Sequence, residues 1–150
     1  MELTISEQEM DRIVRHCQAA YPHEGCGLLL GRAENGHKVV VDVLPTGNAR
    51  EAGARHNRYL IPPEEIYRGE MEAEARGLEV IGYFHSHPDH PARPSEFDRD
   101  HAWPWYSYLI LAVHDGRTVA RRSWQLREDR STFDEETIVP AENNPNERHS

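Results

Sequence analysis

Two histidines and a carboxylate lie in one short stretch of this chain. His85 and His87 follow the apolar run 80–84, which is typical of a buried strand. Side chains alternate along a strand, so both imidazoles should point to the same face. Asp98 comes soon after Ser95, which is expected to begin a helix as its N-cap. Two imidazoles and one carboxylate suit a zinc ion with one position left for water, an arrangement typical of catalytic sites.

A simpler explanation exists for part of this pattern. Residues 95–98 also form an ordinary capping box, which needs no metal. A single histidine at a strand end is more often a core or surface residue than a ligand. Two histidines at this spacing, followed by a proline-stiffened loop and an acid, favour metal binding over that explanation.

The spacing of these residues resembles a known signature. Residues 85–88 (HSHP) and, after six residues, 95–98 (SEFD) match H-x-H-P-x6-S-x-x-D, the JAMM (MPN+) motif of zinc isopeptidases. That family also carries a glutamate just before a Gly-rich apolar strand, a place that Glu24 fills here before residues 25–31. The resemblance implies one zinc ion per chain, held by His85, His87 and Asp98, with Glu24 as general acid and base and Ser95 as oxyanion donor.

The resemblance also implies a fold and a substrate. We expect an α+β protein with a single MPN/JAB-like domain over residues 1–140, built as a mixed β-sheet flanked by helices, and a disordered tail over 141–150. The implied activity is cleavage after the C-terminal Gly-Gly of a ubiquitin-like protein. Because the chain is short, it is most similar to compact prokaryotic members that act on sulfur-carrier proteins, such as CysO-cysteine peptidases.

Two alternatives stay open at this point. The first is a metallo-β-lactamase-like hydrolase, because the same stretch spells H-x-H-x-D-H through four residues: His85, His87, Asp89 and His90. That fold needs further ligands downstream and usually a longer chain, and the histidines that follow are few: His101, His114 and His149. The second is a non-catalytic MPN scaffold, although such relatives lack the ligands that this chain keeps.

Composition limits the classes of function. The chain has 150 residues, 37% of them hydrophobic, and a formal charge of −9, which suits one acidic domain and disfavours binding to nucleic acid or an anionic membrane. The longest apolar run, 108–113, is too short to cross a bilayer. Cys17 and Cys26 lack paired spacing, and the acidic N-terminus does not resemble a signal peptide, so we expect a cytoplasmic protein. Lys38 is its only lysine.

Periodicity predicts the remaining elements. A helix should begin after Ser6, with apolar positions including Met10, Ile13 and Cys17, and a second should span 64–76. Strands are expected at 25–31, 38–44, 106–113 and 118–126, besides the one that precedes the histidines.

Other segments carry weaker signals. The polar stretch 45–58 is expected to be a mobile flap over the site, followed by a short strand at 59–61. The acidic stretch 128–138 has few apolar anchors, and no element is predicted there. Trp103 and Trp105, beside a helix end, are expected to pack against the protein rather than face a substrate.

Overall fold

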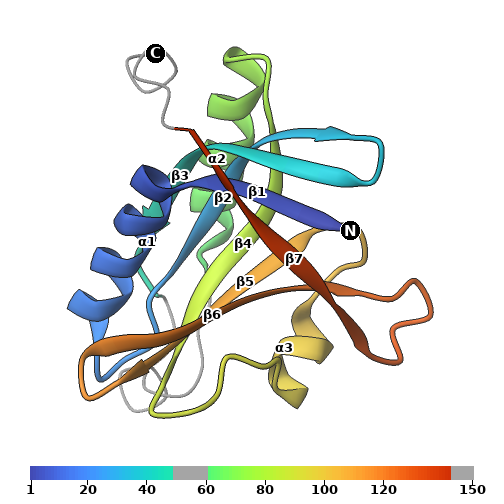
Figure 1. Ribbon diagram of the computed structural model, residues 1–150. Helices are drawn as coiled ribbons and strands as arrows, with labels where there is room; N and C mark the ends of the chain where they lie inside the picture. Colours follow the sequence, from blue (N-terminus) through green and yellow to red (C-terminus); the bar gives the residue numbers. More distant parts are fainter. Residues whose placement is uncertain (49–60, 143–150) are drawn as a thin grey trace.

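The strands of this protein close into a barrel (Figure 1). A computed structural model describes residues 1–48 and 61–142. Its elements in chain order are β1 (Glu2–Ser6), α1 (Glu7–Ala20), β2 (Cys26–Glu34), β3 (His37–Thr46), α2 (Pro63–Ala75), β4 (Glu79–Pro88), α3 (Glu96–His101), β5 (Ser107–His114), β6 (Arg117–Leu126) and β7 (Phe133–Ala141).

The sheet is mixed, as predicted, but its closure was not predicted. The strand order is β1-β3-β2-β4-β5-β6-β7, and β1 completes the ring by pairing in parallel with both β3 and β7. Strands β4 and β5 are also parallel, whereas the β2–β3, β2–β4, β5–β6 and β6–β7 pairs are antiparallel. The expectation of a sheet simply flanked by helices is therefore corrected to a barrel, because two strands were missing from the sequence interpretation.

Strand β7 was missed because its main buried side chain is charged. Glu136 is 2% exposed and accepts a hydrogen bond from Ser123 Oγ of β6 at 2.8 Å. Its other oxygen lies 3.7 Å from Nζ of Lys38 on β3, and that ammonium also donates to Gln125 at 3.3 Å. Buried charges are tolerated when they are paired and hydrogen-bonded. This polar cluster therefore occupies buried positions at which sequence patterns predict apolar residues.

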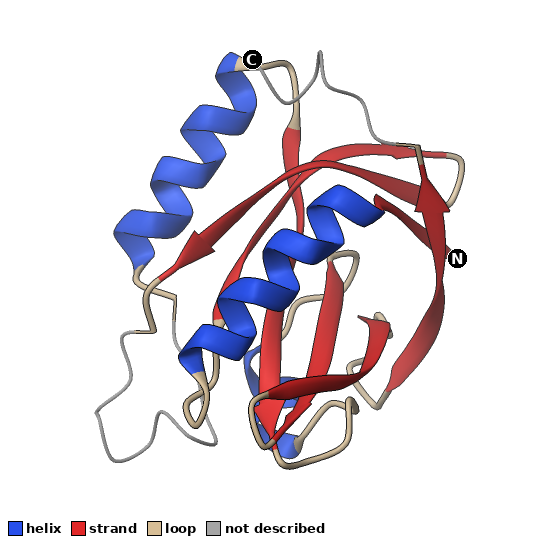
Figure 2. Cartoon of the chain, turned by 60° about the vertical axis from the view of Figure 1, so that its left-hand side comes forward, coloured by secondary structure: helices blue, strands red, loops and turns tan. Residues whose placement is uncertain are grey.

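Helices α1 and α2 cover opposite faces of the central strands (Figure 2). Leu29 and Phe84 belong to a buried cluster with Ile13 and Cys17 of α1. Leu28, the neighbour of Leu29, instead packs in a second cluster that includes α2 residues. This alternation is the period of two that a strand imposes, so the continuous apolar run in β2 reflects burial on both faces. Among the described helices, none is long and apolar enough to cross a membrane.

Tight turns join two pairs of strands where the sequence predicts them. Asn35 and Gly36 connect β2 to β3 with φ values of 45° and 82°, and Asp115 and Gly116 connect β5 to β6 with 51° and 81°. Hairpin loops of two residues favour positive φ at both positions because that backbone matches the twist of the strands. Asn-Gly and Asp-Gly are the residue pairs that tolerate it best.

Part of the predicted flap and of the tail lies outside the described residues. Strand β3 extends to Thr46, so the predicted flap begins inside a strand, and residues 49–60 are not described. Ile61 is described and buried, whereas the rest of the short strand expected there is not. Ala141 ends β7 and residues 143–150 are not described, so the domain boundary stays a prediction.

Asp42 of β3 links both long helices to the barrel. Its Oδ1 accepts from Arg12 of α1 at 2.6 Å, and its Oδ2 accepts from Arg76, at the end of α2, at 2.8 Å. Burial raises the pKa of Asp42, but hydrogen bonds from Arg76 and Arg12 outweigh that effect and hold it below the ordinary value. The carboxylate is thus shared by two guanidinium groups on elements that are distant in the sequence.

The substitution Asp42→Asn should lower the free energy of unfolding by about 1–3 kcal/mol, the typical worth of hydrogen bonds to charged groups. Because the folded pKa is depressed, the stabilisation is present above the ordinary carboxyl pKa of about 4 and is lost as the pH falls through the lower folded value. Urea unfolding of both proteins should show their difference closing in acid. Asp134→Asn, which removes an exposed pair with Arg127, should leave the midpoint almost unchanged.

Candidate metal centre

The two histidines lie within β4 itself, which extends to Pro88 and is longer than the sequence predicts. His85 and His87 are 1% and 7% exposed. They alternate with Phe84 and Ser86, which belong to the opposite face of the strand. Both imidazoles therefore point away from α1 into the same space, as predicted.

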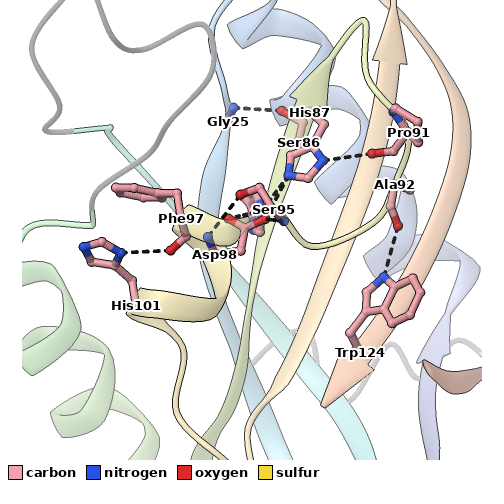
Figure 3. A network of polar contacts seen from close by, with 11 residues as sticks. Gly25, Ser86, His87, Pro91, Ala92, Ser95, Phe97, Asp98, His101 and Trp124 are labelled. Atoms are coloured by element: carbon pink, nitrogen blue, oxygen red, sulfur yellow. Dashed lines mark hydrogen bonds and ion pairs between the residues drawn. The ribbon is translucent and has the colours of Figure 1, made fainter. Parts of the chain in front are cut away.

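Helix α3 places the carboxylate opposite them. Ser95 is its N-cap and accepts from the Asp98 amide at 3.1 Å, while the Asp98 carboxylate accepts from the Ser95 amide at 2.9 Å. This is the predicted capping box, with an aspartate at the position where glutamate is more common. The cap fixes the Asp98 side chain beside His87 (Figure 3) and His85.

Three side chains with donor atoms for a metal converge at this point. His85 Nε2 and His87 Nε2 are 3.2 Å apart, and they lie 3.2 Å and 3.1 Å from the two oxygens of Asp98. Tetrahedral zinc with bonds of about 2.0–2.1 Å separates its ligands by roughly 3.3 Å. The spacing of the donors therefore fits a small tetrahedral metal ion.

A backbone carbonyl orients one of the ligands. His87 Nδ1 lies 2.9 Å from the carbonyl oxygen of Pro91, which can only accept a hydrogen bond (Figure 3). Nδ1 must carry the proton, so in the neutral ring Nε2 carries the lone pair that a metal ion would bind. The sequence interpretation treated Pro91 only as a stiff loop residue, since spacing does not indicate where a carbonyl points.

Burial and mutual charge set the ionisation of these groups. Burial lowers the pKa of His85 below the ordinary value, because the opposing effect of the Asp98 carboxylate is smaller. Burial also lowers the pKa of His87, but the hydrogen bond to Asp98 outweighs it and raises the pKa overall. For Asp98, burial raises the pKa, but the two histidines outweigh it and hold the pKa well below its usual range. The carboxylate is thus ionised at neutral pH and available as a ligand.

Glu24 completes the group from a distant part of the chain. It lies two residues before the start of β2, is 4% exposed, and its backbone carbonyl accepts from Asn48 Nδ2 at 3.2 Å. A carboxylate oxygen of Glu24 and a ring nitrogen of each of His85 and His87 lie within 4.8 Å of one another. Strand pairing brings them together, because Cys26 of β2 is opposite His85 of β4. All five residues singled out in the sequence therefore lie in one place.

A cleft gives access to this group. It has a volume of about 580 Å³ and brings Glu24, His87 and Ser95 to a shared space. The rest of its lining comes from the proline-rich loop, through His90, Pro91, Arg93 and Pro94. Buried donors next to an open cleft are the arrangement expected of a reactive centre rather than a closed structural site.

The alternative ligands of the lactamase-like motif do not gather here. Asp89 is exposed and accepts from the Tyr21 hydroxyl at 2.7 Å and from the Asp115 amide at 3.0 Å. His90 is exposed, and its carbonyl lies 3.3 Å from His114 Nε2. Within residues 1–48 and 61–142, the groups that converge are instead His85, His87, Asp98 and Glu24. Asp89 therefore serves the loop structure, as the sequence interpretation preferred.

Comparison with known proteins agrees with this geometry. A family model described as prokaryotic homologues of the JAB domain matches residues 6–127.

The chain belongs to this family.

Similar JAB proteins include the desampylase of Haloferax volcanii, 32% identical over 123 residues that cover 79% of this chain and 85% of the relative. The probable TtuB-protein conjugate cleaving protease of Thermus thermophilus is 34% identical over 98 residues, 65% of this chain and 62% of that one. These matches confirm the prediction of a compact prokaryotic hydrolase of the JAMM type.

Solved structures also resemble this JAB domain. The solution structure of a protein from Desulfitobacterium hafniense has a TM-score of 0.84 at 31% identity and covers 99% of both chains. A solution structure from Salinibacter ruber has a TM-score of 0.72 at 38% identity, covering 92% of this chain and 91% of that one. Solved structures thus share this fold over nearly the whole chain, and the family model identifies a single JAB-type domain within it, over residues 6–127.

Metal binding should depend on His87 and not on His90, although both histidines line the cleft. His87→Ala should weaken zinc binding by more than about 100-fold, since even residues behind the ligands are worth 10–100-fold. The matched variant His90→Ala should stay within a few-fold of the wild type. Competition with a chromophoric chelator measures both affinities. Two zinc ions per chain, or equal losses in the two variants, would favour the lactamase-like arrangement instead.

Proposed function

We propose that this JAB protein is a zinc-dependent peptidase or isopeptidase that cleaves after the C-terminal Gly-Gly of a ubiquitin-like protein of the sulfur-carrier type. The observation that carries the proposal is the convergence of two imidazoles and two carboxylates beside one cleft. A non-catalytic scaffold has no need of this set, and burying several ionisable groups together is costly unless they serve a purpose.

His85, His87 and Asp98 would hold the metal. Two nitrogen donors and one carboxylate favour zinc over the hard ions magnesium and calcium, which prefer all-oxygen sites. When bound, zinc supplies Lewis-acid catalysis and lowers the pKa of water toward neutrality. The hydrogen bond from His87 to the Pro91 carbonyl keeps that ligand in the right tautomer throughout.

Glu24 acts as the general base and general acid of the reaction. Its carboxylate lies within reach of both histidine rings and lines the cleft where a scissile bond would enter. It accepts a proton from the attacking water and delivers that proton to the leaving amine nitrogen. Such general acid and base catalysis is typically worth 10²–10⁴ in rate.

Ser95 can serve the helix and the reaction together. Its oxygen accepts from the Asp98 amide at 3.1 Å, which leaves the hydroxyl proton available for a second partner. Because Ser95 lines the cleft, that proton can be donated to the oxygen of the scissile carbonyl as negative charge develops there.

An aromatic groove suggests where the substrate tail lies. Tyr83, Phe97 and Trp103 contribute to a mainly apolar groove of about 160 Å³. Phe97, which lines the groove, is the neighbour of Asp98 in α3, so the groove and the metal ligand share this helix. Trp103 is 66% exposed, and the expectation that it packs into the protein is wrong for this residue. A narrow, extended tail ending in two glycines fits such a groove better than a folded surface does.

The relatives favour a protein-conjugate substrate. The Haloferax volcanii protein is named a desampylase, and the Thermus thermophilus protein is named a protease that cleaves conjugates of TtuB. By analogy, we propose that this chain releases a ubiquitin-like protein from an amine to which its tail is joined. Whether that amine is a lysine side chain or the first residue of a short extension is an outcome of the assay below.

Glu24→Gln should keep the zinc affinity of the wild type and lose about 10²–10⁴ of the cleavage rate, because the amide cannot accept a proton. The assay uses the zinc-loaded protein with two substrates, a sulfur carrier extended beyond Gly-Gly and the same carrier joined to a lysine ε-amine. Mass spectrometry identifies the released group.

Each outcome of this assay supports or contradicts a specific part of the proposal. A mass loss equal to the extension, or release of the lysine, supports the peptidase and says which bond it prefers. Turnover by Glu24→Gln close to that of the wild type would remove Glu24 from the mechanism. If the zinc-loaded wild type cleaves neither carrier, the proposed function is wrong.

Replacing Ser95 with glycine should separate its two roles, because glycine in place of serine at a helix N-cap lowers stability by only a few tenths of a kcal/mol. We expect Ser95→Gly to keep its melting temperature within a few degrees and to lose about 10²-fold in kcat, the typical worth of one oxyanion donor. Thermal unfolding and steady-state kinetics measure the two effects. A kcat that falls only in proportion to lost stability would leave Ser95 with the capping role alone.

A further inference from the structure

The residue between the two histidines faces the other side of β4. Ser86 is 0% exposed, and its backbone N–H donates to the carbonyl of Gly25 at 3.0 Å. Its Oγ accepts from the N–H of the same glycine at 2.8 Å (Figure 3). One serine thus binds both polar backbone groups of the residue that follows Glu24.

This arrangement is a modified strand pair. In a regular antiparallel sheet, two hydrogen-bonded residues exchange N–H to C=O bonds in both directions. The ladder between β2 and β4 is paired at Cys26 and His85, and Gly25 and Ser86 come next. Here the N–H of Gly25 donates to the hydroxyl oxygen of Ser86 instead of the carbonyl oxygen of Ser86. The side chain therefore holds the strands together at the point where Glu24 leaves the sheet.

Helix α1 packs against the contact between Gly25 and Ser86. Cys17 is fully buried, and a Cβ atom on Gly25 would lie 3.4 Å from its Sγ. A Cβ atom on Gly25 would lie 3.0 Å from Cys17 Cα, which is too close for a larger residue to fit without displacement. Gly25 is thus held between α1 and β4 with little freedom to move.

We propose that Ser86 is a positioning residue that fixes Glu24 against the metal centre. The proposal rests on the proposed role of Glu24 as proton carrier. His85 and His87 set the place of the ligands, and Ser86, from the same strand, sets the place of the backbone next to Glu24. A reacting group misplaced by about 1 Å can cost about 10²-fold in rate. Ser86 therefore acts on the reaction through Glu24 without touching the substrate.

The test compares four variants with the wild type. Ser86→Ala removes the acceptor, Ser86→Thr restores a hydroxyl, and Ser86→Cys keeps the volume with a weak acceptor. The matched control is Ser107→Ala on the neighbouring strand β5, because Ser107 is also 0% exposed and, among the described residues, its hydroxyl has no hydrogen-bond partner. If Ser86→Ala does not fold, Ser86→Cys is judged by the same measurements.

Four quantities are measured: the exchange rate of the Gly25 amide, kcat, KM and the zinc affinity. Amide hydrogen exchange of Gly25, followed by NMR in the metal-free protein, should accelerate at least about 10-fold in Ser86→Ala, because its N–H loses an acceptor. Cleavage by the zinc-loaded protein should show kcat lowered about 10–100-fold with KM and zinc affinity within a few-fold of the wild type. Ser86→Thr should recover most of the loss, and Ser107→Ala should change none of the four.

The outcomes distinguish this inference from the proposed function. Unchanged Gly25 exchange in Ser86→Ala, or faster exchange with unchanged kcat, overturns the positioning role. An equal loss of kcat in Ser107→Ala would show a general effect of cavity formation and also overturns it. If the wild type cleaves no carrier, the proposed function fails on that result alone, and the positioning of Gly25 is still judged by its exchange.

Discussion

The pairing of β2 with β4 is the constraint on which the site depends. Glu24 and His85 are far apart in the sequence, and they meet because Cys26 is opposite His85 in the ladder. A shift of the register by one residue would turn the histidines toward α1 and bring Ser86 to the cleft, since side chains alternate along a strand. The apolar side chains of β2, buried on both faces, fix that register. The hydrophobic core is therefore what aligns the reactive groups.

Several residues serve the fold and the chemistry at once. Ser95 and Asp98 begin α3 through reciprocal hydrogen bonds, and the same geometry aims the Asp98 carboxylate at the histidines. Pro91 gives the loop its stiffness, and its carbonyl orients His87. Because these groups already have partners within the protein, the donors are held in place before any metal arrives. Such preorganisation lowers the cost of assembling a site when a ligand binds.

The sequence revealed the chemical groups more readily than the arrangement that holds them. His85, His87 and Asp98 follow from strand alternation and a capping signal, both of which are local, whereas Glu24 was identified only through the family resemblance. Strand β7 was missed because its inward-facing Glu136 depends on Lys38, a partner that no local pattern indicates. The role of Ser86 was likewise hidden, since its hydrogen bonds run to a residue sixty-one positions away.

The buried amine of Lys38 is a natural reporter of barrel opening. It is the only lysine of the chain, and its amine lies inside the barrel among residues of β6 and β7. Because this side chain is only 7% exposed, a reagent that acylates amines should react with it much faster when those strands separate from β3. The rate of acylation at this one position is thus a measure of how often the barrel opens, and it requires no engineered label.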